Sequence, residues 1–199
     1  MDSKTSRKEQ THQRILDVAA RAIRRSGYDG VGVADIMKEA GLTHGGFYAH
    51  FASRDAMLAE AIEHAGRISA TTMAARLESR TKRGATPFKA YVESYLSDEH
   101  LAAVDGGCAV AALGSEMPRQ SALVREASVA RLHALIKGVE RVLPAEVPQQ
   151  EAVVIVSTLV GALQLARALG NGPEGRAHLA ANRAALLARY PEVVESSEH

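Results

Sequence analysis

The sequence has very few cysteine and aromatic residues. Its 199 residues include one cysteine, Cys108, and no tryptophan, and aromatic residues make up only 4% of the chain. A single cysteine excludes an internal disulfide framework and a cysteine-based zinc site within one chain. This composition favours a protein of the reducing cytoplasm.

Long apolar runs and long alternating runs of Val, Ile and Thr are also missing. The most apolar run, 152–163, is too short to cross a bilayer and is soon followed by Gln164 and Arg167. The polar N-terminus carries no apolar signal core, so we expect neither export nor membrane insertion. Helix formers dominate, and 46% of the residues are hydrophobic, so the sequence predicts an all-α protein with a real core.

Helical periodicity in the first part of the chain predicts four helices, over about 8–25, 33–40, 44–50 and 54–79. Gly41 is a suitable C-terminal glycine for the second helix, and Thr43 a suitable N-cap for the third. Only three residues therefore separate these two helices. So short a turn forces a sharp crossing, which is typical of a helix-turn-helix.

The rest of the chain predicts about five more helices. They cover the apolar stripes at 88–96 and 132–143, a short segment at about 108–117, and two longer segments at about 149–169 and 174–189. Thr86 and Pro87 form a good cap and first position for the first of these helices. We predict a three-helix head over 8–65, a larger helical bundle over 66–190 and a flexible tail over 191–199.

The stretch from Gly41 to Phe51, GLTHGGFYAHF, has an unusual composition for a helix of a folded domain. Gly45 and Gly46 remove the side chains that would hold a recognition helix away from base edges and phosphates. Phe47 and Phe51 are four residues apart and can bury together against the first helix. Tyr48 points elsewhere and can reach a phosphate oxygen, while Thr43 and His44 can reach bases.

A metal site and an ordinary surface helix are weaker interpretations of this stretch. A metal site made from His44 and His50 is disfavoured because residues six apart lie on different faces of a helix and no thiol or carboxylate completes the set. A surface helix with accidental glycines would lose about 1 kcal/mol for each glycine. The charge adds little, since residues 1–58 hold nine Lys and Arg against seven Asp and Glu. The motif itself therefore predicts double-stranded DNA as a partner.

The segment GVGVADIMKEAGLTHGGFYAHFASRDAMLAEAI resembles the DNA-binding head of the TetR family of bacterial transcriptional regulators. The resemblance covers about 8–65, and the matching residues are Gly45, Phe47, Tyr48, His50, Phe51, Ser53 and Leu58. It implies that His50 belongs to the DNA-binding set. The family often has Ser or Thr before the second helix, where the hydroxyl can touch a phosphate. This chain has Val31, Gly32 and Val33 there, so the backbone amide of Val33 must make that contact instead. Arg54 replaces a frequent Lys and keeps a cation for a phosphate.

The helix AVVIVSTLVGALQLARAL is apolar almost all round, and Gly161 and Ala162 allow another helix to come close. A second copy of the chain is the simplest cover, although the central core helix of a monomer has the same pattern. The resemblance favours the homodimer, because TetR-like proteins pair their last two helices in a four-helix bundle.

The resemblance also implies a small-molecule effector in the helical bundle over 66–190. A single recognition helix this short contacts too few bases for useful specificity, so we expect the homodimer to read an imperfect palindrome. The candidate residues for the effector cavity are Tyr91, Tyr95, Met117, His133 and Gln164. The predicted domains are then a DNA-binding domain over 8–65 and a ligand-binding and dimerisation domain over 66–190. Repression is the sign of regulation that the family implies.

Cys108 has two interpretations. At the start of a short helix, the backbone amides favour its thiolate. GGCAVAALGSEM also resembles the segment of those TetR-like regulators that carry a cysteine here, some of which respond to reactive electrophiles. Asp105 opposes that charge, and single cysteines are more often small buried hydrophobes. A thiol enzyme using Cys108 and a ligand carrier that does not bind DNA are the alternatives. The first lacks a catalytic motif and the second has no use for GLTHGGFYAHF, so we expect no enzyme activity, no cofactor and no metal.

Overall fold

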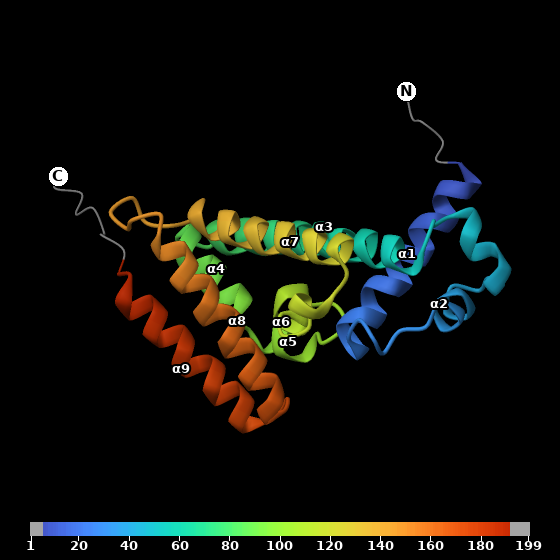
Figure 1. The fold of residues 1–199 in the computed structure, drawn as a ribbon. Helices are drawn as coiled ribbons and strands as arrows, with labels where there is room; N and C mark the ends of the chain where they lie inside the picture. The colour runs from blue at the N-terminus through green and yellow to red at the C-terminus, as the bar shows by residue number, and fades with distance from the viewer. Residues whose placement is uncertain (1–5, 192–199) are drawn as a thin grey trace, which may run out of the picture. The chain divides into compact units, whose positions relative to one another are not determined.

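The computed structural model describes residues 6–191, which form only helices and their connections (Figure 1). Within these residues there are nine α-helices and two 3-10 helices, which confirms the all-α prediction. They are α1 (Arg7–Ser26), α2 (Val33–Glu39), η1 (His44–Ala49), α3 (Arg54–Thr81), α4 (Pro87–Tyr95), α5 (Asp98–Ala102), α6 (Ala109–Leu113), η2 (Met117–Arg119), α7 (Ala122–Glu140), α8 (Glu151–Leu169) and α9 (Pro173–Arg189). The tail predicted over 191–199 lies outside the described residues except for Pro191.

The chain divides into two compact units, and each combines segments that are distant in the sequence. The first unit contains the chain up to Ala70 together with Ala103–Leu132, and the second contains Thr71–Ala102 and the chain from His133 onward. Helices α3 and α7 therefore contribute residues to both units. The predicted functional domains, 8–65 and 66–190, follow a single boundary in the sequence and stay a prediction.

In the first unit, α1 begins at a complete capping box. The Ser6 hydroxyl accepts a hydrogen bond from the Glu9 amide, and the Glu9 carboxylate accepts one from the Ser6 amide. The helix buries an apolar face that includes Ile15 and Ile23. Two histidine–carboxylate pairs then join α1 to α3. Nε2 of His12 lies 2.7 Å from Oε2 of Glu60, and Nε2 of His64 lies 2.6 Å from Oδ1 of Asp17.

In the second unit, α8 and α9 pack side by side, and α4 packs against α9 (Figure 1). The predicted start of α4 is confirmed, because the Thr86 hydroxyl accepts from the Lys89 amide and Pro87 occupies the first position. The close approach of α9 to the end of α8 requires Gly175. A Cβ atom there would lie 2.1 Å from the carbonyl oxygen of Gly170.

The middle of the chain differs from the prediction. The helix expected over 108–117 is only the five residues of α6, and a separate 3-10 turn, η2, follows it. The intervening Gly114 and the proline at 118 are poor residues for continuing a helix. Helix α5 was not predicted, since five residues are too few to show a periodicity. Helix α7 begins at Ala122, ten residues before the predicted apolar stripe.

Helix α8 has 19 residues, so the apolar segment is longer than the run 152–163 considered from the sequence. By length and composition alone it is long and apolar enough to cross a membrane. A core helix meets the same criterion. Seven residues of α8, among them Ile155, Leu159 and Leu163, are buried within the second unit, as they would be in a core helix.

His100 is a buried polar residue of the second unit. Its Nδ1 lies 2.6 Å from the carbonyl oxygen of Tyr95, and its backbone amide donates to the Ser97 hydroxyl. Arg167 donates to the His100 carbonyl oxygen at 3.0 Å. Burial lowers the pKa of His100 to about 4; the hydrogen bond to Tyr95 opposes this shift, and the charges of Arg167 and Arg76 add to it. His100 is therefore neutral in the folded protein near pH 7.

We predict that His100 makes the protein less stable as the pH falls from about 6.5 to about 4. In this window the unfolded chain protonates a histidine with a pKa of about 6.5, while the folded chain does not. The difference destabilises the folded state by about 3 kcal/mol at the acid end. Urea unfolding of the wild type and of His100→Gln at pH 7 and pH 4 measures it. Between pH 7 and pH 4, the free energy of unfolding should fall by about 3 kcal/mol less in the variant than in the wild type. An equal fall in both proteins would contradict the prediction.

Candidate nucleic-acid interface

The turn between α2 and η1 is closed by backbone hydrogen bonds around Gly41. The Gly41 amide donates to the Lys38 carbonyl at 3.0 Å, and the Leu42 amide donates to the Met37 carbonyl at 2.8 Å. These are the two bonds of a Schellman motif, which places its glycine in the left-handed region. Gly41 has a φ of 70°, so the turn itself requires glycine here. The predicted helix-turn-helix connection is therefore present.

The third helix was predicted to be α-helical and capped by Thr43, and both details are wrong. Residues His44–Ala49 form the 3-10 helix η1, which is short and contains two glycines that weaken an α-helix. Thr43 occupies the N-cap position with an extended backbone, but its side chain makes no capping hydrogen bond. The Gly46 amide donates to the Thr43 carbonyl instead. The Thr43 and His44 side chains are both exposed.

The predicted burial of Phe47 and Phe51 is confirmed, whereas the contact of Tyr48 with a phosphate stays a prediction. Phe47 and Phe51 are buried, and their ring centroids lie 5.5 Å apart. The ring of His12, on α1, stacks on Phe51 at 4.5 Å. Tyr48, in contrast, is 72% exposed. It is an aromatic side chain that the core of the unit does not use.

Gly45 and Gly46 are not required by the fold of this chain. Neither has a positive φ, so an L-residue can adopt both conformations. A Cβ atom at Gly45 would meet no atom within 4 Å, and one at Gly46 would make ordinary contacts with Met37 and Thr43 at 3.7 and 3.8 Å. The two glycines therefore lower helix stability without a packing reason within the described residues.

His50 and Arg54 lie next to this exposed surface but are partly engaged. His50 is half-buried, and its Nδ1 has no hydrogen-bond partner among residues 6–191. Burial lowers the pKa of His50, and the charges of His12 and Lys8 add to this. Arg54 donates from Nε to the Val31 carbonyl at 3.2 Å and from Nη2 to the Tyr28 carbonyl. Only its remaining N–H groups are available to a phosphate.

A set of buried polar contacts fixes the connection between α1 and α2. The Tyr28 side chain is fully buried, its backbone amide donates to the Glu116 carboxylate at 2.9 Å, and its hydroxyl lies 2.8 Å from Ser128 Oγ. Ser128 uses its own proton on the Val124 carbonyl, so Tyr28 is the donor. Burial raises the pKa of Tyr28 to about 12, and Glu116 adds to the shift. Tyr28 therefore stays a neutral donor.

Arg24 makes a second connection between α1 and the segment before α6. It is buried and donates from Nε to the Ala20 carbonyl at 2.9 Å and from Nη1 to the Gly107 carbonyl at 3.2 Å. Gly107 directly precedes Cys108, which is buried at the N-cap position of α6. Sequence patterns did not identify Arg24, Tyr28 or Glu116. Their partners are 83 and 88 residues away in the chain, and no local pattern indicates such a pairing.

The residues predicted for an effector cavity do not share one unit. Cys108 and Met117 belong to the first unit and are buried. In the second unit, Tyr91 and Tyr95 are buried with their rings stacked 6.4 Å apart, Gln164 is half-buried and His133 is exposed. Their role as an effector site stays a prediction.

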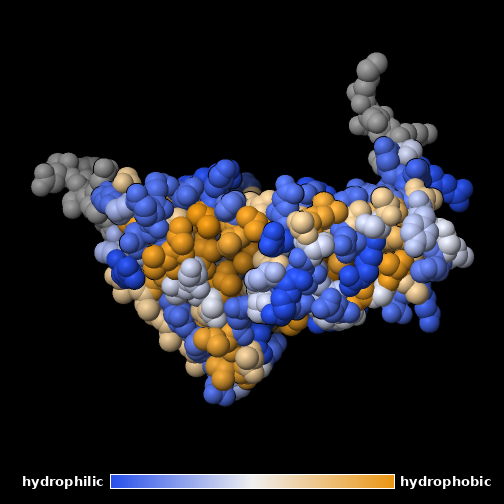
Figure 2. All heavy atoms as spheres, in the orientation of Figure 1, coloured by the Kyte–Doolittle hydropathy of each residue, from blue (hydrophilic) through white to orange (hydrophobic). Residues whose placement is uncertain are grey.

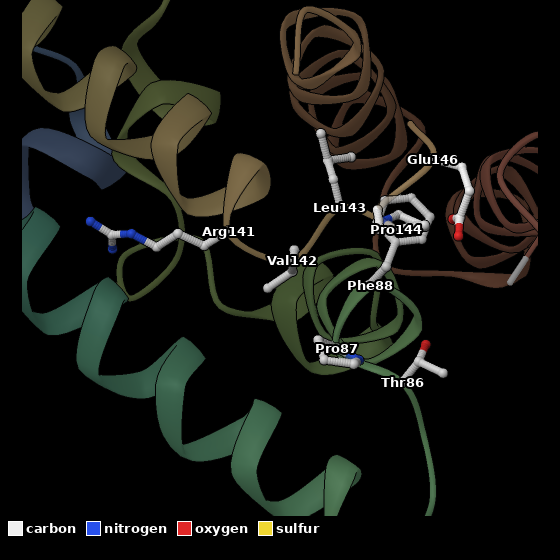
Figure 3. Close-up of a pocket in the computed structure, with 9 residues that line it drawn as sticks. Thr86, Pro87, Phe88, Arg141, Val142, Leu143, Pro144 and Glu146 are labelled. Carbon is white, nitrogen blue, oxygen red and sulfur yellow. The ribbon is translucent and has the colours of Figure 1, made fainter. Parts of the chain in front are cut away.

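The second unit has a small hollow of about 280 Å³ between the start of α4 and the α7–α8 connection (Figure 3). Phe88 and Pro144 lie close together there, whereas Arg141 extends away from them (Figure 3). None of the predicted effector residues lines this hollow. Within residues 6–191, no group of three or more His, Cys, Asp or Glu side chains is placed to hold a metal ion.

Residues 15–61 match a protein family described as bacterial regulatory proteins, tetR family. The chain also has the fold of solved TetR-family regulators. One from Cytophaga hutchinsonii gives a TM-score of 0.78 at 18% identity, over 96% of this chain and 99% of that chain. One from Chloroflexus aurantiacus J-10-FL gives a TM-score of 0.75 at 23% identity, over 91% of this chain and 94% of that chain. FadR from Bacillus subtilis, solved in complex with stearoyl-CoA, gives a TM-score of 0.65 at 17% identity, over 89% of this chain and 98% of that chain. No curated protein sequence matches the chain.

We predict that Tyr28→Phe lowers the free energy of unfolding by about 1 kcal/mol, because it removes a buried hydrogen bond to Ser128 and leaves the ring in place. Tyr48→Phe is the matched control, since it removes the same hydroxyl from an exposed side chain. It should change the free energy of unfolding by less than about 0.5 kcal/mol. Urea unfolding measures both variants, and equal effects would show that the buried bond does not stabilise the fold.

Proposed function

We propose, from the premise that the chain is a TetR-family transcriptional regulator, that it represses transcription by binding a palindromic operator as a homodimer and leaves the operator when a small molecule binds. The observation that carries the DNA-binding part is the pair Gly45 and Gly46, which the fold does not require, beside the exposed Tyr48. On an exposed helix-turn-helix, two adjacent glycines leave the backbone without covering side chains, which allows it to come close to DNA.

The exposed residues have different roles in this proposal. Thr43 and His44 are the residues at the start of η1 that reach base edges, and they set sequence preference. Tyr48 contacts a phosphate oxygen, and so does the backbone amide of Val33 at the start of α2, where the N-cap Gly32 has no side chain. Arg54 acts mainly as a positioning residue, because it already donates to the Tyr28 and Val31 carbonyls.

The proposed dimer interface is formed by α8 and α9. Exposed apolar residues follow one side of α8 (Figure 2), and they are Val153, Val154, Leu165 and Leu169. Gly161 lies between them, and a Cβ atom there would meet nothing within 4 Å. Helix α9 adds exposed alanines at one-turn spacing, at positions 177, 181, 184 and 188. Small and apolar residues on two adjacent helices suit close packing in a four-helix bundle.

The proposed effector is a small molecule that residues of the body, 66–190, recognise. FadR from Bacillus subtilis, which has the same fold, was solved with stearoyl-CoA, an example of such a ligand. Cys108 stays a candidate for an electrophile-sensing residue, because Arg24 ties the adjacent Gly107 to α1. The proposed function places the protein in the cytoplasm, where operator DNA lies, and requires no catalysis.

We predict that Gly45→Ala weakens DNA binding about tenfold or more while the fold stays as stable as the wild type or becomes slightly more stable. The new methyl group meets open space within the chain but holds the backbone away from DNA. Alanine is also the better helix former, by up to about 1 kcal/mol. Fluorescence anisotropy with genomic fragments retained by the wild-type protein measures the affinity.

Gly172→Ala is the matched control for this experiment. It makes the same substitution in the second unit, at a glycine whose Cβ would also meet nothing within 4 Å and whose φ is negative. It should leave the affinity for DNA within about twofold of the wild type. Unchanged DNA binding by Gly45→Ala would remove the main support for η1 as the recognition element.

A second prediction concerns the homodimer. One short recognition element contacts too few bases for useful specificity, so a duplex with both half-sites should bind far more tightly than a duplex with one. Titration of both duplexes, with the mass of each complex measured by light scattering, tests this. Leu165→Glu places a charge in the proposed interface and should give a folded monomer that loses the preference for the full site. Equal affinity of the wild type for both duplexes would contradict the dimer.

A further inference from the structure

The second unit has a larger hollow, of about 570 Å³, between the C-terminal half of α3 and the segment where α4 ends and α5 begins. Its volume lies within the range of small-molecule sites. The charged or buried polar residues that line it are Arg76, Arg80, Arg83, Ser94, Ser97 and Glu99. They differ from the residues predicted for an effector cavity. Three guanidinium groups therefore meet at one hollow.

The three arginines come from the same part of the chain. Arg76 and Arg80 are four residues apart and share one face of α3. Arg83 lies in the turn that follows α3 and also lines the hollow. Arg80 pairs with Glu93 at 2.7 Å, and Arg76 has a long hydrogen bond of 3.4 Å to the Ser94 carbonyl. Arg83 is exposed and makes no hydrogen bond or ion pair with its side chain among residues 6–191. Within the described residues, the Arg80 side chain therefore has a strong partner, the Arg76 side chain has a weak one and the Arg83 side chain has none.

The opposite wall is formed by hydroxyl groups and one carboxylate. Ser94 and Ser97 are both more than nine-tenths buried. The Ser94 hydroxyl has no hydrogen-bond partner in the part of the chain that the structure describes, which is unusual for a buried polar group. Glu99 lies at the rim. Its own backbone amide and Ser97 lower its pKa by hydrogen bonding, and the charges of Arg76 and Arg80 add to this, so it stays ionised.

We propose that this hollow binds a small polar molecule that carries a phosphate or carboxylate group. The ligand's anionic group would pair with Arg83 and Arg76, the two arginines whose internal partners are absent or weak. The Ser94 hydroxyl supplies a donor on the opposite wall, and the Glu99 carboxylate can accept from a hydroxyl or amino group of the same molecule. Glu93 and Glu99 offset two of the three positive charges, which disfavours a long polyanion and favours a small one.

Isothermal titration calorimetry of the wild-type protein with inorganic phosphate and, separately, with citrate tests the proposal at constant ionic strength. We expect saturable binding of at least one anion, and the anion that binds shows whether the site takes a phosphate or a carboxylate. Arg83→Gln should weaken this binding about tenfold, because a hydrogen bond to a charged group is lost. Because Arg83 is exposed, the substitution should not change the stability of the fold. Ser94→Ala should weaken binding without changing the charge.

Lys82→Gln is the matched control, since it removes the same charge one residue away, from a lysine that pairs with Glu78 and does not line the hollow. It should bind the anion within about twofold of the wild type. The proposal would be overturned if the wild type showed no saturable binding of either anion. It would also be overturned if Lys82→Gln and Arg83→Gln lost equal affinity for the anion, because that result indicates nonspecific electrostatic attraction. Weaker binding of a nonspecific DNA duplex by Arg83→Gln, but not by Lys82→Gln, would assign the hollow to the DNA backbone and also overturn it. Wild-type affinity for the operator does not enter these results, so they are independent of the proposed function.

Discussion

The position of the helix-turn-helix depends on a buried polar cluster at the end of α1. Tyr28 donates to Glu116 and Ser128, and its carbonyl accepts from Arg54, which also binds the Val31 carbonyl. Burying a polar group without a hydrogen-bond partner costs several kcal/mol of folding free energy. Breaking these hydrogen bonds while the groups stay buried is therefore unfavourable. The connection that delivers the chain into α2 is thereby held at both of its ends.

The same cluster links the helix-turn-helix to a segment far along the chain. Glu116 and Gly107 both lie within segment 103–119, and they bind Tyr28 and Arg24 at the end of α1. A displacement of this segment must either carry the end of α1 with it or break these bonds. The proposed effector response needs such a physical connection, and Cys108 lies within the same segment. All of these residues belong to the first unit, so the end of α1 and segment 103–119 are held together within that unit.

Three surfaces of the protein differ in chemistry, and each difference suggests a different partner. The surface around η1 combines a bare backbone with Tyr48 and suits a nucleic acid. The exposed side of α8, with Leu165 and Gly161, suits another helix. The hollow beside Arg76 and Arg83 suits a small anion. A mutation on one surface is therefore a test of one partner only.

The sequence by itself determined most helices and the division of the aromatic residues, because both follow from local rules. Periodicity and capping predict α1, α8 and the start of α4, and spacing predicts that Phe47 and Phe51 are buried while Tyr48 is not. Only the tertiary structure decided that η1 is a 3-10 helix and that Arg54 holds the α1–α2 connection. It also brought Tyr28 to Glu116, 88 residues later, and Arg76 of α3 to Ser94 of α4. These contacts depend on how distant segments pack, which no short window of sequence records.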